Sequence, residues 1–373
     1  MIAYVTDIEG QWDKLVSFAS ANPHVSLVDD ALVLADGVTF VFGGDAIDRG
    51  PAGRKIVRTF TAAKRRYGDR VVLLAGNRDI NKLRLVHELD EPRANVPKEL
   101  ASHADRLAWI LEHTMGAPHA FEFRAAELAA EGRAHDPDAV AQSYLDDLAP
   151  DGELRAYLEA CQLAYRQGVT LFVHGGVSAV NLFTVPDRPR VDSVDAWIAA
   201  LNDFYRAQLA LDHPATLIAY QAPLPGTHAN ETSVVYARPT DDVGDPILPP
   251  AEVIAALRAD GIERVVVGHT PSGDCPAVIR SGDFELVLAD NSYGRIEHGS
   301  QLAIDNSSIT VRGVTKLDDD SIVDVALTTS RHDRGPLGTH DPDGALIKAK
   351  LADGRYLLFK SLGEHHVRQT ARK

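Results

Sequence analysis

The stretch Gly43-Gly44-Asp45-Ala46-Ile47-Asp48-Arg49-Gly50 joins a predicted strand to a predicted helix. The apolar run at 38–42 is typical of a buried strand, and the proline after the stretch suits the first turn of a helix. Its two carboxylates and its guanidinium therefore lie at the carboxyl end of a strand, where open α/β sheets bind ligands. These groups suit a metal ion with a phosphate; a polar loop with an ion pair is the simpler alternative.

The same pattern recurs at four other predicted strand ends. In each place an apolar run is followed by potential metal ligands, usually beside a glycine: Asp7 with Glu9, Asn77, His174 and His269. One such Asp would more often cap a helix, and one such His would more often be structural, but chance rarely repeats the pattern five times. Carboxylate, amide and imidazole groups together suit two divalent metal ions that share a bridging carboxylate.

The order of these motifs resembles the calcineurin-like metallophosphoesterases. It is most similar to their phosphoprotein-phosphatase branch, which includes bacterial and phage phosphatases and diadenosine-tetraphosphate hydrolases. The motifs are Asp-x-Glu at 7–9, Gly-Gly-Asp-x-x-Asp-Arg-Gly at 43–50, Gly-Asn-Arg-Asp at 76–79, His-Gly-Gly at 174–176 and Gly-His-Thr-Pro at 268–271. The resemblance implies an α/β fold in which a β-sandwich is flanked by helices, with the site at a loop edge.

The resemblance also implies roles for individual residues. Asp45 would bridge two metal ions, Asp7 would bind the first, and the second would be bound by Asn77, His174 and His269. Arg49 and Arg238 would bind the phosphate, a task that suits planar bidentate cations. The remaining catalytic candidates are Asp48, Arg78 and Asp79. Residues 288–291 resemble the strand end that closes the site.

Two residues depart from the family pattern. Glu9 stands where the family has His; it would favour a hard ion at the first metal, or it does not bind metal. We expect manganese, with iron, zinc or magnesium as alternatives. Arg78 also replaces a His, which in the family pairs with an Asp, here Asp79, and protonates the leaving group. Arginine cannot donate that proton near neutral pH, although it can stabilise a leaving oxygen, so we expect substrates with good leaving groups.

Two alternatives accompany the substitution at residue 78. Arg78 would be purely structural if it paired with Asp79 or with a carboxylate of the insert. A proton donor could come from another histidine, although a solvent-exposed surface residue is the favoured interpretation of each candidate: His87, His103, His113, His119 and His228.

The pattern changes between residues 88 and 167, where helical periodicity predicts helices at 103–115, 120–130, 137–148 and 153–166 and no strand. The chain then divides into a discontinuous core, residues 1–87 and 168–373, and an all-helical insert, residues 88–167. The insert would either cap the active site or form a structural layer. Beyond residue 290, further strand patterns predict extra C-terminal strands, ending in a hairpin at 346–360.

Composition limits the remaining possibilities. The 373 residues are 45% hydrophobic and carry a net charge of −15, which disfavours binding to nucleic acid or to an anionic membrane. The N-terminus reads as a strand instead of a signal peptide, and no segment is apolar for long enough to span a bilayer. Two cysteines imply no disulfide framework, so we expect a cytoplasmic protein. The oligomeric state is left open.

These observations predict a dinuclear metal-dependent phosphoesterase that hydrolyses a small phosphorylated metabolite or nucleotide by attack of a metal-bridging hydroxide. A protein Ser/Thr phosphatase is one alternative, against which Arg78 and the insert count. A metal-binding homologue with lost or non-hydrolytic chemistry is the other.

Overall fold

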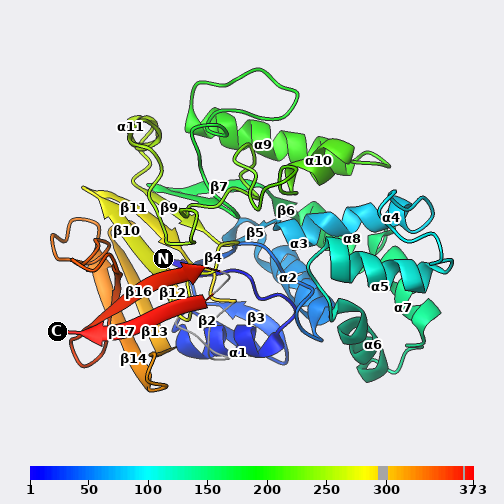
Figure 1. Ribbon diagram of the computed structural model, residues 1–373, viewed down its shortest axis with the longest axis horizontal. Helices are drawn as coiled ribbons and strands as arrows, with labels where there is room; N and C mark the ends of the chain where they lie inside the picture. Colours follow the sequence, from blue (N-terminus) through cyan, green and yellow to red (C-terminus); the bar gives the residue numbers. More distant parts are fainter. Residues whose placement is uncertain (293–300, 364–365) are drawn as a thin grey trace.

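Two large β-sheets stack at the centre of the molecule (Figure 1). The computed structural model describes residues 1–292, 301–363 and 366–373. The first sheet has seven strands in the order β14-β13-β12-β1-β4-β5-β6, and the second has five in the order β10-β11-β9-β8-β7. β1, β4, β5 and β6 run parallel, as do β8, β9 and β11.

The strands of the first sheet are β1 (Ile2–Val5), β4 (Thr39–Phe42), β5 (Val71–Leu74), β6 (Cys161–Gln162), β12 (Gln301–Ile304), β13 (Ser308–Lys316) and β14 (Ile322–Ser330). Those of the second are β7 (Ala164–Gln167), β8 (Thr170–Val173), β9 (Arg264–Val267), β10 (Ala277–Ser281) and β11 (Phe284–Leu288). A small hairpin is formed by β2 (Val25–Val28) and β3 (Ala31–Leu34).

Alternate side chains of each strand point to the two faces of its sheet, and along the central strands β1, β5, β8 and β9 both faces are buried. Between the sheets, Tyr4 of β1 stacks on Phe172 of β8 with ring centroids 5.7 Å apart. On the outer face of the first sheet, Phe40 of β4 packs against Phe18 and Phe60, which belong to α1 (Trp12–Ala21) and α2 (Gly53–Tyr67). The expected β-sandwich flanked by helices is therefore confirmed.

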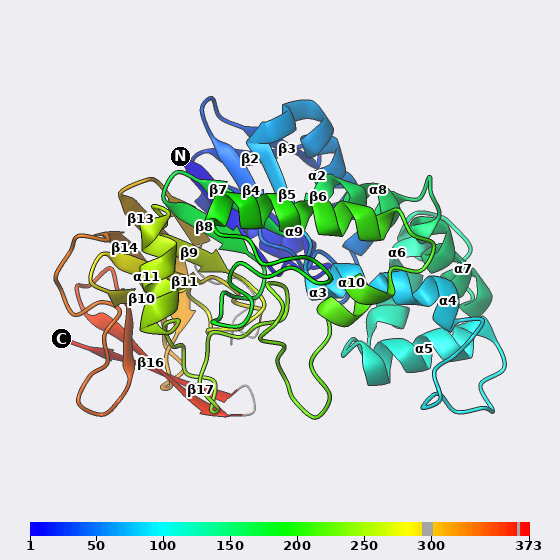
Figure 2. The same ribbon diagram turned by 90° about the horizontal axis from the view of Figure 1, so that it is seen from above.

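Helices also cover the second sheet and extend beyond it (Figure 2). They are α9 (Val194–Leu209), α10 (Ala215–Tyr220) and α11 (Ala251–Ala259). A short helical turn, η1 (Gly68–Arg70), leads from α2 into β5, and three more follow β5: α3 (Asn77–Ile80), η2 (Asn81–Arg84) and α4 (Leu85–Glu88). Across the described residues, no helix combines the length and apolarity needed to cross a membrane.

The insert contains the four predicted helices: α5 (His103–Thr114), α6 (Ala120–Ala130), α7 (Pro137–Leu148) and α8 (Glu153–Ala160). The prediction of helix through residue 166, with no strand, is wrong. The helix ends at Ala160, and Cys161 pairs with Leu73 of β5, so the chain enters the first sheet as β6 and the second as β7. Pairing with a strand edge outweighs the helical periodicity here, because local propensity is a weak preference.

The C-terminal strands lie at the opposite end of the molecule from the insert (Figures 1 and 2). The predicted extra strands are present as β12, β13 and β14, and they extend the first sheet. The predicted terminal hairpin is also present as β15 (Leu346–Lys350) and β16 (Tyr356–Gly363), and β17 (His366–Arg372) makes it a three-stranded sheet.

Candidate metal centre

The predicted metal-type residues follow the carboxyl ends of parallel strands in both sheets. Asp7 and Glu9 follow β1, Asp45 follows β4, Asn77 follows β5, His174 follows β8 and His269 follows β9. Because these strand ends meet at one edge of the sandwich, residues up to 262 positions apart come into contact there. The side chains are buried except at Asn77, which is partly exposed. The structure thus brings together all six predicted metal-binding residues.

Backbone strain is concentrated at this edge. Asp7, Glu9, Asp45, Asp48 and His269 have φ values of 51°, 54°, 60°, 102° and 60°. Non-glycine residues rarely adopt such angles, and their clustering is typical of functional sites. Hydrogen bonds hold the strained loops together, since the N–H groups of Asp7 and Glu9 donate to the carbonyls of Gly44 and Asp45, both at 2.9 Å.

One group of potential metal ligands converges at this edge. His174 Nδ1 lies 2.7 Å from the carbonyl of Gly43, which can only accept, so Nδ1 donates to that carbonyl and Nε2 is the ring nitrogen that faces the site. That Nε2 lies 3.2 Å from Asn77 Oδ1 and 3.4 Å from Asp45 Oδ1. His269 Nε2 is buried without a hydrogen-bond partner, and atoms of Asp45, His174 and His269 come within 4.8 Å of one another. This donor set fits a divalent metal ion.

The charges around these residues favour a bound cation. Burial lowers the pKa of His174, but the charge and hydrogen bond of Asp45 outweigh it and raise that pKa to about 10. Burial, followed by the charges of Arg238 and His174, holds the pKa of His269 well below its usual range. The protein thus places negative charge beside one imidazole and keeps the other neutral, which is the form that binds metal.

A second group consists of carboxylates. Oxygens of Asp7, Glu9 and Asp45 lie within 4.8 Å of one another. Burial, and then the charge of Asp290, raise the pKa of Asp7 well above its usual value. The guanidinium of Arg78 adjoins this group, with Nε 2.8 Å from Glu9 Oε1 and 3.7 Å from Asp45 Oδ2.

Asp79 contacts the backbone of the neighbouring loop. Its carboxylate accepts hydrogen bonds from the N–H groups of Asp45, Ala46 and Gly76 at 2.8–2.9 Å. The carboxylate that approaches Nη1 of Arg78 is Asp48, at 3.8 Å. In this structure Asp79 therefore supports the loop that carries Asp45, and the expected Arg78–Asp79 pair is replaced by contacts to Glu9 and Asp48.

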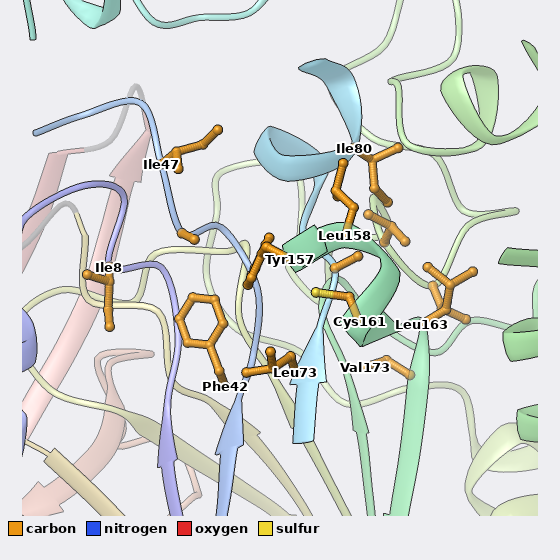
Figure 3. Packing of buried hydrophobic residues seen from close by; sticks show 14 of the residues in the cluster. Ile8, Phe42, Ile47, Leu73, Ile80, Tyr157, Leu158, Cys161, Leu163 and Val173 are labelled. Carbon is orange, nitrogen blue, oxygen red and sulfur yellow. The ribbon is translucent and has the colours of Figure 1, made fainter. Parts of the chain in front are cut away.

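Glycines permit the close approach of these loops. A side chain at Gly44, where φ is 104°, would place its first carbon 2.6 Å from His174 Nδ1, and one at Gly76 would collide with the carboxylate of Asp45. Figure 3 shows the apolar side chains that pack below, among them Phe42, Tyr157 and Cys161. The centre thus rests on a rigid core.

The centre opens into a cavity of about 1130 Å³. Arg49, Arg78 and Arg238 all line it. The phosphate-binding role expected of Arg49 and Arg238 stays a prediction. Arg238 Nε donates to the carbonyl of His228 at 3.1 Å and Nη1 to that of His269 at 3.4 Å, so its guanidinium is held beside the metal-type residues. Arg49 Nη1 lies 3.4 Å from Glu9 Oε2.

Both ends of the molecule contribute to the cavity wall. The insert supplies Thr114, Met115 and Gly116, and the C-terminal sheet supplies Phe359 and Val367. Of the five histidines considered as proton donors, His228 alone is among the described residues that line the cavity. Elsewhere in the insert, α8 packs against α2, α7 packs on α8, and α5 and α6 pack on α7 and on each other.

A model of the calcineurin-like phosphoesterase family matches residues 1–273. The chain belongs to this family. The match includes the five strand-end motifs and the insert, whereas β12 to β17 lie beyond it. Calcineurin-like phosphoesterases generally use two divalent metal ions, and the chain is accordingly a phosphoester hydrolase of a metal-dependent family. No curated protein matches the sequence.

Solved structures of phosphatases share the fold of this calcineurin-like phosphoesterase. A cold-active protein-tyrosine phosphatase from a psychrophilic Shewanella species aligns with a TM-score of 0.50 and 16% identity over 87% of this chain and 79% of that one. A protein serine/threonine phosphatase from Saccharomyces cerevisiae aligns more loosely, with a TM-score of 0.40 and 14% identity over 93% and 82%.

Two further residues of this phosphoesterase site are not evident from its sequence. Lys82 is fully buried and donates to Asp48 Oδ2 and Asn81 Oδ1, both at 2.6 Å. Tyr236 packs on the ring of His269 with centroids 4.6 Å apart and lines the cavity. A lysine in a helical turn resembles a surface residue, and a Tyr two positions before Arg238 carries no motif of its own. Asp290, expected only as part of a closing strand end, is buried beside Asp7.

Proposed function

We propose that this phosphoesterase hydrolyses a small phosphorylated metabolite or a nucleotide. The observation that carries the proposal is the convergence of Asp45, Asn77, His174 and His269 at the wall of a 1130 Å³ cavity that also presents three arginines. Such a cavity is much larger than a phosphate group and falls at the upper end of the range for small-molecule sites.

The chain's own residues would bind and orient the substrate. Arg49 and Arg238 lie on the cavity wall, where their guanidinium groups would bind phosphate oxygens and stabilise the charge that develops in the transition state. A divalent ion held by Asp45, Asn77, His174 and His269 would polarise the phosphate and lower the pKa of a water molecule. The family pattern implies a second ion at the position of Asp7, Glu9 and Asp45, and manganese is the expected metal.

Arg78 would determine which substrates react. Its guanidinium stays charged at any working pH, so it stabilises a leaving oxygen without protonating it. We therefore expect a substrate whose leaving group is acidic, such as the phosphate of a polyphosphate chain.

Turnover on a panel of phosphorylated compounds tests the proposal. The panel contains sugar phosphates, nucleotides, dinucleoside polyphosphates and phosphopeptides, each assayed with manganese and with excess chelator. We expect metal-dependent hydrolysis of at least one small molecule, and loss of it in His269→Ala. Hydrolysis of phosphopeptides alone would identify a protein phosphatase, and metal binding without turnover on any compound would contradict the proposal.

A further inference from the structure

The two groups of potential ligands differ in what already surrounds them. In the group formed by Asp45, Asn77, His174 and His269, His174 Nε2 faces two oxygens. Among the described residues, none gives His269 Nε2 a hydrogen-bond partner, although this nitrogen is buried. A buried nitrogen without a partner is costly, so this group remains available to an ion from outside the chain.

The carboxylate group already has donors from the protein. Glu9 Oε1 lies 2.8 Å from Arg78 Nε, and Glu9 Oε2 lies 3.4 Å from Arg49 Nη1. The carboxylate of Asp7 accepts hydrogen bonds from the Thr6 hydroxyl at 2.6 Å and from the N–H of His269 at 3.1 Å. Both oxygens of Glu9 thus face guanidinium groups, and the group needs no external ion to satisfy its hydrogen-bonding capacity.

Arg78 is held at both ends. Its backbone N–H donates to Asp45 Oδ1 at 2.8 Å, and its Nη1 donates to the carbonyl of Gly116 at 3.3 Å. Between these points the guanidinium passes Asp45 Oδ2 at 3.7 Å and Asp48 Oδ2 at 3.8 Å, and the side chain is 10% exposed. A divalent ion bound by both Glu9 and Asp45 would lie next to this fixed positive charge, which would repel it strongly in a buried site.

We propose that the Arg78 guanidinium, paired with Glu9, takes the place of the first metal ion, so that the chain binds a single divalent ion through Asp45, Asn77, His174 and His269. The carboxylate group of Asp7, Glu9 and Asp45 therefore does not fit a metal ion while Arg78 is present. This inference deepens the proposed function by giving the number of bound metal ions. It rests on the proposed function only in taking phosphoester hydrolysis as the reaction.

The pairing gives one explanation for both departures from the family pattern. A glutamate at residue 9 without Arg78 would add negative charge to a cluster that already contains Asp7, Asp45 and Asp290. An arginine at residue 78 without Glu9 would add positive charge beside a bound metal. Together the two side chains neutralise each other at 2.8 Å, which removes both costs.

Metal stoichiometry tests the inference independently of activity. The apoprotein is dialysed against Mn²⁺, and bound manganese per chain is measured by elemental analysis, with electron paramagnetic resonance to detect a pair of coupled ions. We expect one uncoupled Mn²⁺ in the unmodified protein and a second ion in Arg78→Ala, in Arg78→Gln and in the double variant Glu9→His/Arg78→His. Arg238→Ala is the matched control, because it removes a guanidinium from the same cavity away from Glu9, and it should keep one ion.

The results that would contradict this inference can be distinguished from those that would contradict the proposed function. Two coupled ions, or none, in the unmodified protein would overturn the inference even if every variant failed to fold. A single ion in folded Arg78→Ala and Arg78→Gln would show that Arg78 does not exclude the second ion, and would overturn it as well. If the protein binds one ion but hydrolyses no compound of the phosphoester panel, the proposed function is contradicted. The inference about the number of bound ions then still stands.

Discussion

We propose that residue 78 governs how a leaving group departs from this site. Arg78 contacts three carboxylates, those of Glu9, Asp45 and Asp48, and cannot release a proton near neutral pH. Hydrolysis would then depend on how well the leaving oxygen carries negative charge by itself. The kinetics of the reaction should show this dependence directly.

We expect log kcat for a series of aryl phosphates to fall steeply as the pKa of the leaving phenol rises. Arg78→His should flatten the slope, because Asp48, 3.8 Å from Arg78 Nη1, could orient the new imidazole as a proton donor. Single-turnover rates are the appropriate measure, since they report the chemical step. A flat plot in the unmodified enzyme would refute the dependence on leaving group.

Arg238 offers a test of phosphate binding. Replacing it with Ala should cost about 2–4 kcal/mol of transition-state stabilisation, the scale of losing a preorganised charge, and should leave metal content unchanged. The measurement is kcat/KM on the best small substrate, with Arg188→Ala, an exposed arginine, as the control. Equal kcat/KM in the two variants would show that Arg238 does not bind the substrate phosphate.

Asp45 is the carboxylate shared by both ligand groups. Asp45→Asn should abolish most metal binding and nearly all turnover, because the amide keeps one acceptor oxygen but loses the negative charge. Metal analysis and kinetics both report the effect, and Asp36→Asn, at an exposed position, should change neither. Full metal content with full turnover in Asp45→Asn would rule out this centre.

At the scale of elements, the insert is fixed to the core by a buried ion-pair network. Asp147 of α7 lies between two arginines, with Oδ1 2.5 Å from Arg54 Nη1 of α2 and Oδ2 2.6 Å from Arg124 Nη1 of α6. All three side chains are nearly inaccessible to solvent. The network makes the insert a layer against α2, and residues 114–116 extend from that layer to the cavity.

Asp147→Ala should destabilise the protein by about 3–5 kcal/mol, because it leaves two buried guanidinium groups without their shared partner. Urea unfolding followed by circular dichroism measures the loss. The neighbouring Asp146→Ala, at an exposed position, should stay within about 0.5 kcal/mol of the unmodified protein. Similar midpoints for both variants would show that the network contributes no stability.

The elements differ in how far their sequence determines them. Strand ends such as 43–50 and 174–176 were predictable, because a short buried apolar run followed by glycine and a polar residue has a local physical meaning. The strand at 161–162 was not, because its pairing with β5 depends on tertiary contact. The same holds for the ion pair between Glu9 and Arg78, which are far apart in sequence and meet only when β1 and β5 lie in one sheet.

For the whole molecule, bound metal should contribute to global stability, because the ligands come from both sheets. An ion present at about 100 times its dissociation constant stabilises the folded state by about 2.7 kcal/mol. In a chain of this size, chelation should therefore lower Tm on the order of 3 °C, and added Mn²⁺ should restore it. Thermal scans with and without chelator provide the measurement, and Tm of His269→Ala should not change on chelation. If chelation leaves Tm of the unmodified protein unchanged, that result would argue against a bound ion.

The position of β1 inside the first sheet has a consequence for biosynthesis. Ile2 pairs with Thr39 on one side and with Ile304 on the other. A ribosome adds about 5–20 residues per second, so the first strand waits on the order of tens of seconds before its second neighbour emerges. During that interval one edge of a hydrophobic strand is open to other nascent chains. Newly made chains should therefore depend on chaperones until β12 has emerged and paired with β1.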